Sequence, residues 1–120
     1  STQIVARVSL HSQTMEVLVD GRPAFAWKVS TGRKGFETPT GAFKPTRMHE
    51  MWYSTKYDDA PMPHAVFFSG GYAVHATDAI KRLGRPASHG CVRLHPNDAA
   101  DFFTLVNTFG PSNTSIVITE

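Results

Sequence analysis

A tight-turn signal between two apolar segments constrains the fold of this chain more than any other feature. Asp20-Gly21 separates residues 15–19 from residues 24–29, and an Asp-Gly pair in such a place predicts a β-hairpin because both turn residues adopt positive φ. Further segments rich in β-branched and aromatic residues are expected strands, at residues 4–10, 42–47, 65–68, 72–75 and 115–119. Pro45 lacks a backbone N–H, which favours a sheet edge for its strand. The pattern predicts a mainly β fold.

The C-terminal half contains two expected helices. In residues 96–109, apolar side chains recur at steps of three and four, Asn97 or Asp98 can cap the first turn, and Gly110-Pro111 ends the helix. Residues 78–83 are a shorter candidate, followed by a glycine. One longer C-terminal helix and one short helix are therefore expected to pack against the sheet.

Residues 48–63 are expected to form an irregular loop. Trp52, Tyr53 and Tyr57 lie there among charged residues and two prolines. A loop of this length in a compact chain is commonly a lid or a binding loop. The alternative is a surface loop whose aromatic side chains anchor it to the core, and both interpretations stay open at this point.

Length and charge exclude several classes of protein. The 120 residues suffice for a single domain spanning residues 1–120, and 41% hydrophobic with 18% charged residues is a globular composition. Twelve Lys and Arg against ten Asp and Glu give a net charge of +2, which argues against nucleic acid as a partner. No apolar run approaches the roughly 18 residues that a membrane span needs.

The single cysteine, Cys91, cannot form a disulfide within the chain, so it is a buried small side chain, a metal ligand or a nucleophile. Its neighbours are unlike those of a structural cysteine. Gly90 lets a ligand approach the backbone closely, and Arg93 shares a face with Cys91 in an extended segment, where its charge favours a thiolate. These neighbours favour a nucleophile.

Three histidines are candidates for the base that would activate this thiol: His75, His89 and His95. His89 flanks Cys91, where the backbone direction makes a contact awkward, whereas His75 ends an expected strand 16 residues earlier. We therefore assign His75 as the base; a half-buried structural imidazole is the alternative. Zinc bound by these histidines and Cys91 is a further alternative, but His-x-Cys-x-x-x-His lacks the usual paired ligand spacing.

Basic residues are concentrated beside Cys91. Lys81, Arg82, Arg85 and Arg93 fall within 13 residues, with only Asp78 nearby. A solvated surface explains one or two of them. Because Arg presents a planar fork that matches a carboxylate, the cluster also predicts a carboxylate-binding rim beside the nucleophile. An acidic small substrate suits four cations better than a nucleic acid does.

The segment that carries this chemistry resembles a known family. His75-Ala76 followed by Gly84-Arg85-Pro86-Ala87-Ser88-His89-Gly90-Cys91-Val92-Arg93-Leu94 is similar to the signature of the L,D-transpeptidase (YkuD) catalytic domain. Residues 38–43, Thr-Pro-Thr-Gly-Ala-Phe, resemble a second segment of that family. The resemblance runs from about residue 5 to the C-terminus.

The resemblance implies a role for each matching residue. Cys91 matches the catalytic nucleophile and His75 its base, while the backbone carbonyl of Ala76 would orient the imidazole and Gly90 would offer its N–H to an oxyanion. The family usually has Gly where this chain has Ala76, and the alanine side chain restricts the backbone conformations available at this position. A further set of matching residues is expected to support or bind substrate: Tyr72, Arg85, Ser88, His89 and Arg93.

The implied fold is β-sandwich-like with a helix, and the implied activity is acyl transfer in peptidoglycan. Cys91 would attack the bond between the third residue, a meso-diamino acid, and D-Ala of a tetrapeptide stem, and an amine of a second stem would resolve the thioester. The alternatives are hydrolysis of stems or release of wall-linked protein, and a wall-binding module without activity. Partners would be peptidoglycan stems and an outer-membrane protein as a possible acceptor. The expected location is the periplasm, after removal of a signal peptide, and no cofactor or metal is expected.

Overall fold

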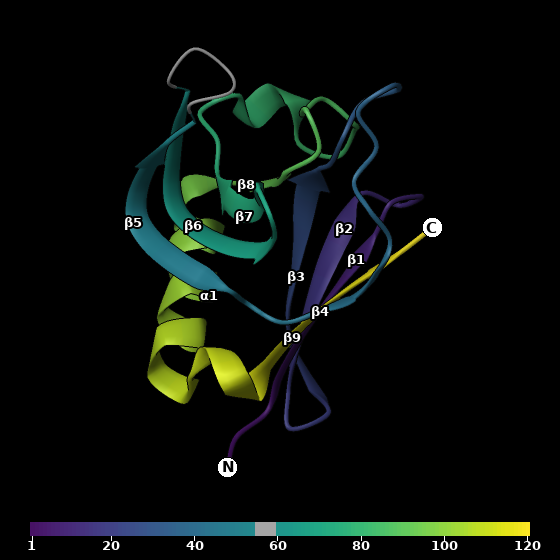
Figure 1. Cartoon of the computed structure of the whole chain (residues 1–120). Helices are drawn as coiled ribbons and strands as arrows, with labels where there is room; N and C mark the ends of the chain where they lie inside the picture. Colours follow the sequence, from purple (N-terminus) through teal and green to yellow (C-terminus); the bar gives the residue numbers. More distant parts are fainter. Residues whose placement is uncertain (55–59) are drawn as a thin grey trace.

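A computed structural model describes residues 1–54 and 60–120 of the chain. Nine strands and one α-helix are present in this part (Figure 1). The strands are β1 (Ile4–Ser9), β2 (Thr14–Val19), β3 (Arg22–Ser30), β4 (Gly41–Phe43), β5 (Arg47–Tyr53), β6 (Pro61–Ser69), β7 (Tyr72–Ala76), β8 (Val92–Leu94) and β9 (Thr114–Thr119). The helices are α1 (Pro96–Phe109) and two single 3₁₀ turns, η1 (Ile80–Arg82) and η2 (Pro111–Asn113).

All nine strands belong to one sheet, in the order β4-β9-β1-β2-β3-β8-β7-β6-β5. Figure 1 shows that this sheet curls, so that the arm from β8 to β5 lies opposite the arm formed by β1, β2 and β9, with the main core between them. The prediction of a mainly β fold with one longer C-terminal helix is confirmed. The sandwich-like shape arises from the two arms of a single curled sheet, a half-barrel, rather than from two separate sheets.

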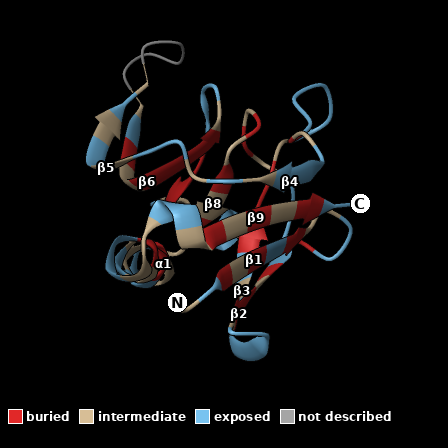
Figure 2. Cartoon of the chain, turned by 60° about the horizontal axis from the view of Figure 1, so that its bottom comes forward, coloured by how far each residue is buried: buried red, intermediate tan, exposed pale blue. Residues whose placement is uncertain are grey.

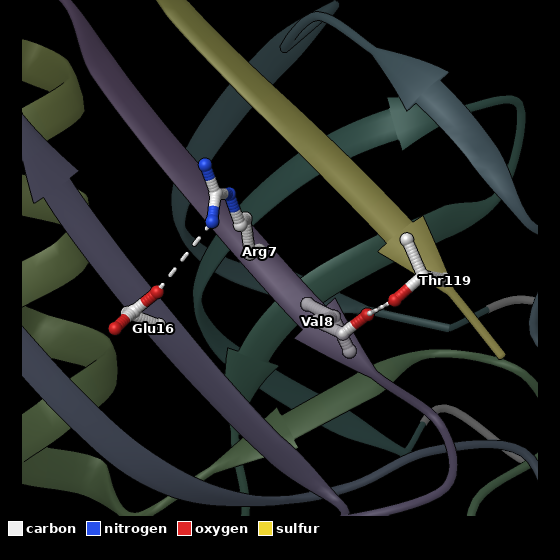
Figure 3. Close-up of polar contacts among 4 residues, drawn as sticks. All are labelled: Arg7, Val8, Glu16 and Thr119. Carbon is white, nitrogen blue, oxygen red and sulfur yellow. Dashed lines mark hydrogen bonds and ion pairs between the residues drawn. The ribbon is translucent and has the colours of Figure 1, made fainter. Parts of the chain in front are cut away.

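The predicted Asp-Gly hairpin is present between β2 and β3. Asp20 has φ 50° and Gly21 has φ 80°, which is the backbone geometry that such a turn requires. Burial alternates along β1 and β9, as Figure 2 shows, because one face of this arm meets the core. On its other face, Arg7 and Glu16 approach to 3.9 Å across β1 and β2, and the Thr119 hydroxyl donates to the Val8 carbonyl at 3.4 Å (Figure 3).

The prediction of an irregular loop at residues 48–63 is wrong, because β5 and the first part of β6 pair as a hairpin there. Pro61 and Pro63 discouraged a strand assignment. Both prolines pair with β5 and lie outside the part of β6 that pairs with β7. Because no described strand is paired on their other side, their missing N–H groups remove no hydrogen bond between β6 and β7. Tyr57 lies outside the described residues.

Strand β6 is buried on both faces, and this divides the apolar interior into two clusters. Val66 and Phe68 point into the main core, which α1 covers, while Ala65 and Phe67 belong to a second cluster on the opposite face. A continuous apolar run is the sequence pattern of such a strand. The second cluster consists of Met62, Ala65, Phe67 and Ala73, with Trp52 and Cys91 packed against it.

Helix α1 has the predicted bounds, packs against β6, β7 and β8, and ends at Gly110. Its N-cap is His95, not Asn97 or Asp98: the His95 imidazole accepts a hydrogen bond from the Asn97 N–H at 3.1 Å. Pro96 explains the shift, since proline is favoured at the first helical position and places the cap one residue earlier. The short helix expected at residues 78–83 is the single turn η1. No helix in the described part of the chain has the length and apolar character needed to cross a membrane.

Candidate active site

Parallel strands β7 and β8 bring the predicted nucleophile and base together. His75 pairs with Arg93 and Val74 with Val92, so Cys91, one residue before β8, lies beside Ala73. Side chains two residues apart share a face of a sheet. His75, Cys91 and Arg93 therefore face the same side of the sheet, where all three line one cleft.

The cleft has a volume of about 1370 Å³, and the second apolar cluster forms its floor. Its described lining residues come from five parts of the chain: Gly35–Glu37, the β5 residues Arg47, Trp52 and Ser54 just beyond it, Ala60–Pro63 with Phe67, Gly71–Tyr72 with His75–Ala79, and His89, Cys91 and Arg93. The β5–β6 hairpin, which was expected to be a loop, therefore forms one wall. Sequence reasoning missed Phe36 and Arg47, because neither lies near the motif along the chain.

His75 is buried, with 5% of its surface exposed. Its Nδ1 lies 2.7 Å from the Ala76 carbonyl oxygen. Because a carbonyl only accepts, Nδ1 carries the proton and the neutral ring presents Nε2 as its basic nitrogen. Burial lowers the pKa of His75 to about 4, against a raising effect of the Ala76 bond and a further lowering by Arg93. The imidazole is therefore neutral at pH 7, and Ala76 supplies the orienting carbonyl despite its side chain.

Cys91 is also neutral in this structure. Burial raises the pKa of its thiol, although the Ala73 N–H and the Arg93 charge act in the opposite direction. The thiol donates to the Gly71 carbonyl at 3.8 Å. The pair at rest is thus a thiol and a neutral imidazole, rather than a thiolate and an imidazolium.

Ser88 holds the loop that carries Cys91. Its hydroxyl donates to the Cys91 carbonyl at 2.6 Å and accepts from the Gly90 N–H at 3.0 Å. Two other bonds tie its backbone to residues 31–33: Ser88 N–H to the Thr31 carbonyl and Arg33 N–H to the Ser88 carbonyl, both at 3.0 Å. Ser88 is fully buried, so the expectation that it binds substrate is corrected: its contacts position the Cys91 loop.

Gly90 has a steric role that the sequence indicated. Its φ is +122°, and a Cβ placed there would overlap with the Tyr72 ring. The Thr38 hydroxyl, from the Thr-Pro-Thr-Gly segment, donates to the Gly90 carbonyl at 2.7 Å. The prediction that the Gly90 N–H donates to an oxyanion is also corrected, because this N–H donates to the Ser88 hydroxyl.

His89 packs on the far side of the cleft from β5. The Arg33 guanidinium lies 3.2 Å from His89 Nε2, and both residues contact the Phe36 ring. Burial, then the charges of Arg33 and Arg93, lower the pKa of His89. His89 and Tyr72 line the cleft, and their contact with substrate stays a prediction.

The expected basic rim is only partly present. Of the four clustered cations, Arg93 lines the cleft, whereas Arg85 is exposed outside it and Lys81 lines a separate, smaller depression. Arg85 does not line the described part of this cleft, and its contact with substrate stays a prediction. Arg47 supplies a cation from the opposite wall.

Metal ligands do not gather in the described residues, where no three His, Cys, Asp or Glu side chains form a potential metal site. His95, one of the four residues considered for zinc, caps α1 instead. His49 packs in β5 against Trp52 with ring centroids 4.7 Å apart.

Comparison with known proteins identifies the class to which this fold and site belong. The features compared are a curled sheet, a histidine on β7 and a cysteine just before β8. The sequence model of the YkuD family, the L,D-transpeptidase catalytic domain, matches residues 3–118. The chain belongs to this family. L,D-transpeptidases act on the peptidoglycan of the cell wall, which lies outside the cytoplasm.

Individual relatives are distant in sequence and close in fold. The chain is 24% identical over 126 residues to the Bacillus subtilis protein named "Putative L,D-transpeptidase YqjB", covering 94% of this chain and 69% of that protein. An L,D-transpeptidase from Mycobacterium smegmatis superimposes with a TM-score of 0.90 at 22% identity, covering all of this chain and 60% of that one. One from Stackebrandtia nassauensis gives 0.85 at 27% identity, covering 98% and 56%. The chain thus spans about 60% of the length of these solved structures.

Proposed function

We propose that this domain is a peptidoglycan L,D-transpeptidase that acts through a Cys91 thioester. One observation carries the proposal: His75, with its proton held on Nδ1 by the Ala76 carbonyl, faces the same cleft as Cys91 from the adjacent strand. A nucleophile, a base and a group that orients the base are the components of covalent acyl transfer.

The reaction starts from a neutral pair. The Cys91 thiol turns from the Gly71 carbonyl toward His75, and sulfur attacks the carbonyl between the third residue and D-Ala as Nε2 takes the thiol proton. The C–N bond then breaks, the imidazolium gives its proton to the departing D-Ala amine, and a thioester remains. An amine of a second stem attacks the thioester; His75 removes a proton from it and returns one to the sulfur. The result is one new amide bond and a regenerated thiol.

Other residues contribute without reacting. Ser88 positions the Cys91 loop, while Arg93, Tyr72 and His89 line the cleft where the stem would lie. Arg93 is half-buried beside Cys91, and its charge favours the thiolate that develops during attack. Such a domain would work in the periplasm, where its substrate is.

Mass spectrometry of the products tests the proposal. Wild-type protein is incubated with a defined disaccharide-tetrapeptide, and a cross-linked dimer with release of D-Ala is expected. Cys91→Ala should form no thioester and no dimer, with the same thermal unfolding as wild type. Free tripeptide without dimer would replace transfer by hydrolysis, the alternative that uses water as acceptor. Binding of stems without any product in the wild type would overturn the enzymatic proposal.

A further inference from the structure

The wall of the cleft opposite Cys91 contains an arginine that the family signature does not include. Arg47 begins β5, and its guanidinium carbon lies 4.0 Å from the Phe67 ring centroid and 4.9 Å from that of Trp52. Two aromatic faces therefore hold the guanidinium by cation–π contact. All three residues line the cleft.

This guanidinium has no carboxylate partner among the described residues, where the ion pair present is Arg7–Glu16, on the other arm of the sheet. The Trp52 and Phe67 rings are perpendicular to each other, with centroids 5.8 Å apart, so they contact the guanidinium from two directions. These contacts involve its positive charge and do not require its N–H groups, which remain available. Those groups match the two oxygens of a carboxylate. Because stacking fixes the side chain beforehand, binding costs little additional ordering.

The sheet register relates Arg47 to the nucleophile. Arg47 pairs with Phe67, Phe67 pairs with Ala73, and Ala73 lies beside Cys91, so the four residues form one row across the cleft floor. The guanidinium lies over Phe67, two strands from Cys91, which corresponds to roughly 10 Å at about 4.8 Å per strand. Phe67 and Ala73 between them are buried and apolar.

We propose that Arg47, held by Trp52 and Phe67, is a carboxylate subsite for the donor stem. This inference rests on the proposed function and names the group of the substrate that the far end of the cleft recognises. The side-chain carboxylate of a meso-diamino acid lies six carbon–carbon bonds from the carbonyl that Cys91 attacks, about 7–8 Å when extended. The terminal carboxylate of D-Ala lies one residue away, about 4 Å. The contacts at the two ends add about 3 Å between sulfur and the carbonyl and about 4 Å between the carboxylate and guanidinium carbons. Both carboxylates can therefore span the roughly 10 Å, and experiment distinguishes them.

Three donor tetrapeptides separate the two carboxylates: the unmodified stem, a stem amidated at the third-residue side-chain carboxylate, and a stem amidated at its C-terminus. For wild type, amidation of the recognised carboxylate should lower kcat/KM by about 10- to 100-fold, as expected for loss of a charged hydrogen bond. Arg47→Met keeps an unbranched stem over Phe67 and removes the charge. This variant should lower kcat/KM for the unmodified stem by a similar factor, mainly by raising KM. Its kcat/KM for the stem amidated at the recognised carboxylate should be almost the same as that of wild type.

Two further variants complete the design. Arg47→Lys keeps the charge without the fork and should give an intermediate loss, and Arg22→Met, an exposed arginine at the start of β3, should match wild type. Thermal unfolding of each variant checks that the hairpin is intact. An equal loss by Arg47→Met on all three donors would mean that Arg47 merely covers Phe67, and would overturn the subsite.

Failure of the proposed function gives a different result. Wild type would then turn over none of the three donors, whatever residue occupies position 47. The subsite is tested independently by calorimetric binding of the unmodified tetrapeptide to Cys91→Ala, with and without Arg47→Met. The subsite is supported if Arg47→Met weakens binding of the unmodified tetrapeptide but does not change binding of the peptide amidated at the recognised carboxylate. Equal affinities of the single and double variants for the unmodified peptide overturn it.

Discussion

The two faces of β6 show how one strand serves stability on one side and chemistry on the other. Val66 and Phe68 enter the main core, which consists of apolar side chains from several strands and from α1. Ala65 and Phe67 enter the second cluster, which no helix of the described residues covers and which Arg47, Trp52 and other residues of the cleft border instead. Both faces are equally buried at β6. The difference lies in what covers them: a fixed helix, or side chains that a substrate can contact.

The largest expected effect is on the face toward the main core. Phe68 is 3% exposed and packs against Phe43 with ring centroids 5.2 Å apart. Phe68→Ala should lower the free energy of unfolding by about 4 kcal/mol, because it removes a buried ring and leaves a cavity. Urea unfolding measures this loss. The kcat/KM of the fraction that stays folded should remain within about twofold of wild type, and a large change there would mean that the two faces are not separate.

A second prediction concerns acid. The pKa of buried His75 is about 4 in the folded protein and about 6.5 when unfolded. Between these values the unfolded chain binds more protons than the folded protein. The contribution of His75 to the free energy of unfolding is therefore complete above about pH 6.5 and is lost as the pH drops toward 4. The loss should be on the order of 3 kcal/mol.

Urea unfolding at pH 7 and pH 4 checks this, with His75→Gln as the control. That variant should lose the contribution of His75 to the pH dependence. If it retains the same slope, other groups cause the acid sensitivity and His75 is not the buried neutral base of the cleft.

The sequence predicted the parts of the molecule that rest on local rules. The Asp20-Gly21 hairpin and helix α1 follow from turn chemistry and apolar periodicity. The motif also led to Cys91 and His75, which line one cleft, while their catalytic roles stay predictions. Prediction from the sequence failed for β5 and the start of β6, whose prolines are tolerated only because of where the neighbouring ladder ends. Arg47 could not be predicted either, since its position relative to Cys91 depends on pairing from β5 through β6 and β7 to β8.

The smallest effect on stability comes from the pair Phe67→Leu and Phe68→Leu, and it sharpens the comparison most. Each keeps an apolar side chain of similar size, so each should lower the free energy of unfolding by less than about 1.5 kcal/mol. Only Phe67 supports the Arg47 guanidinium through its ring. Loss of that cation–π contact costs about 0.5–1 kcal/mol at an exposed site, so Phe67→Leu should raise KM for the unmodified stem two- to fivefold, while Phe68→Leu leaves it unchanged. Equal KM values for the two variants would show that the open face of β6 contributes packing alone, and that its ring does not orient Arg47.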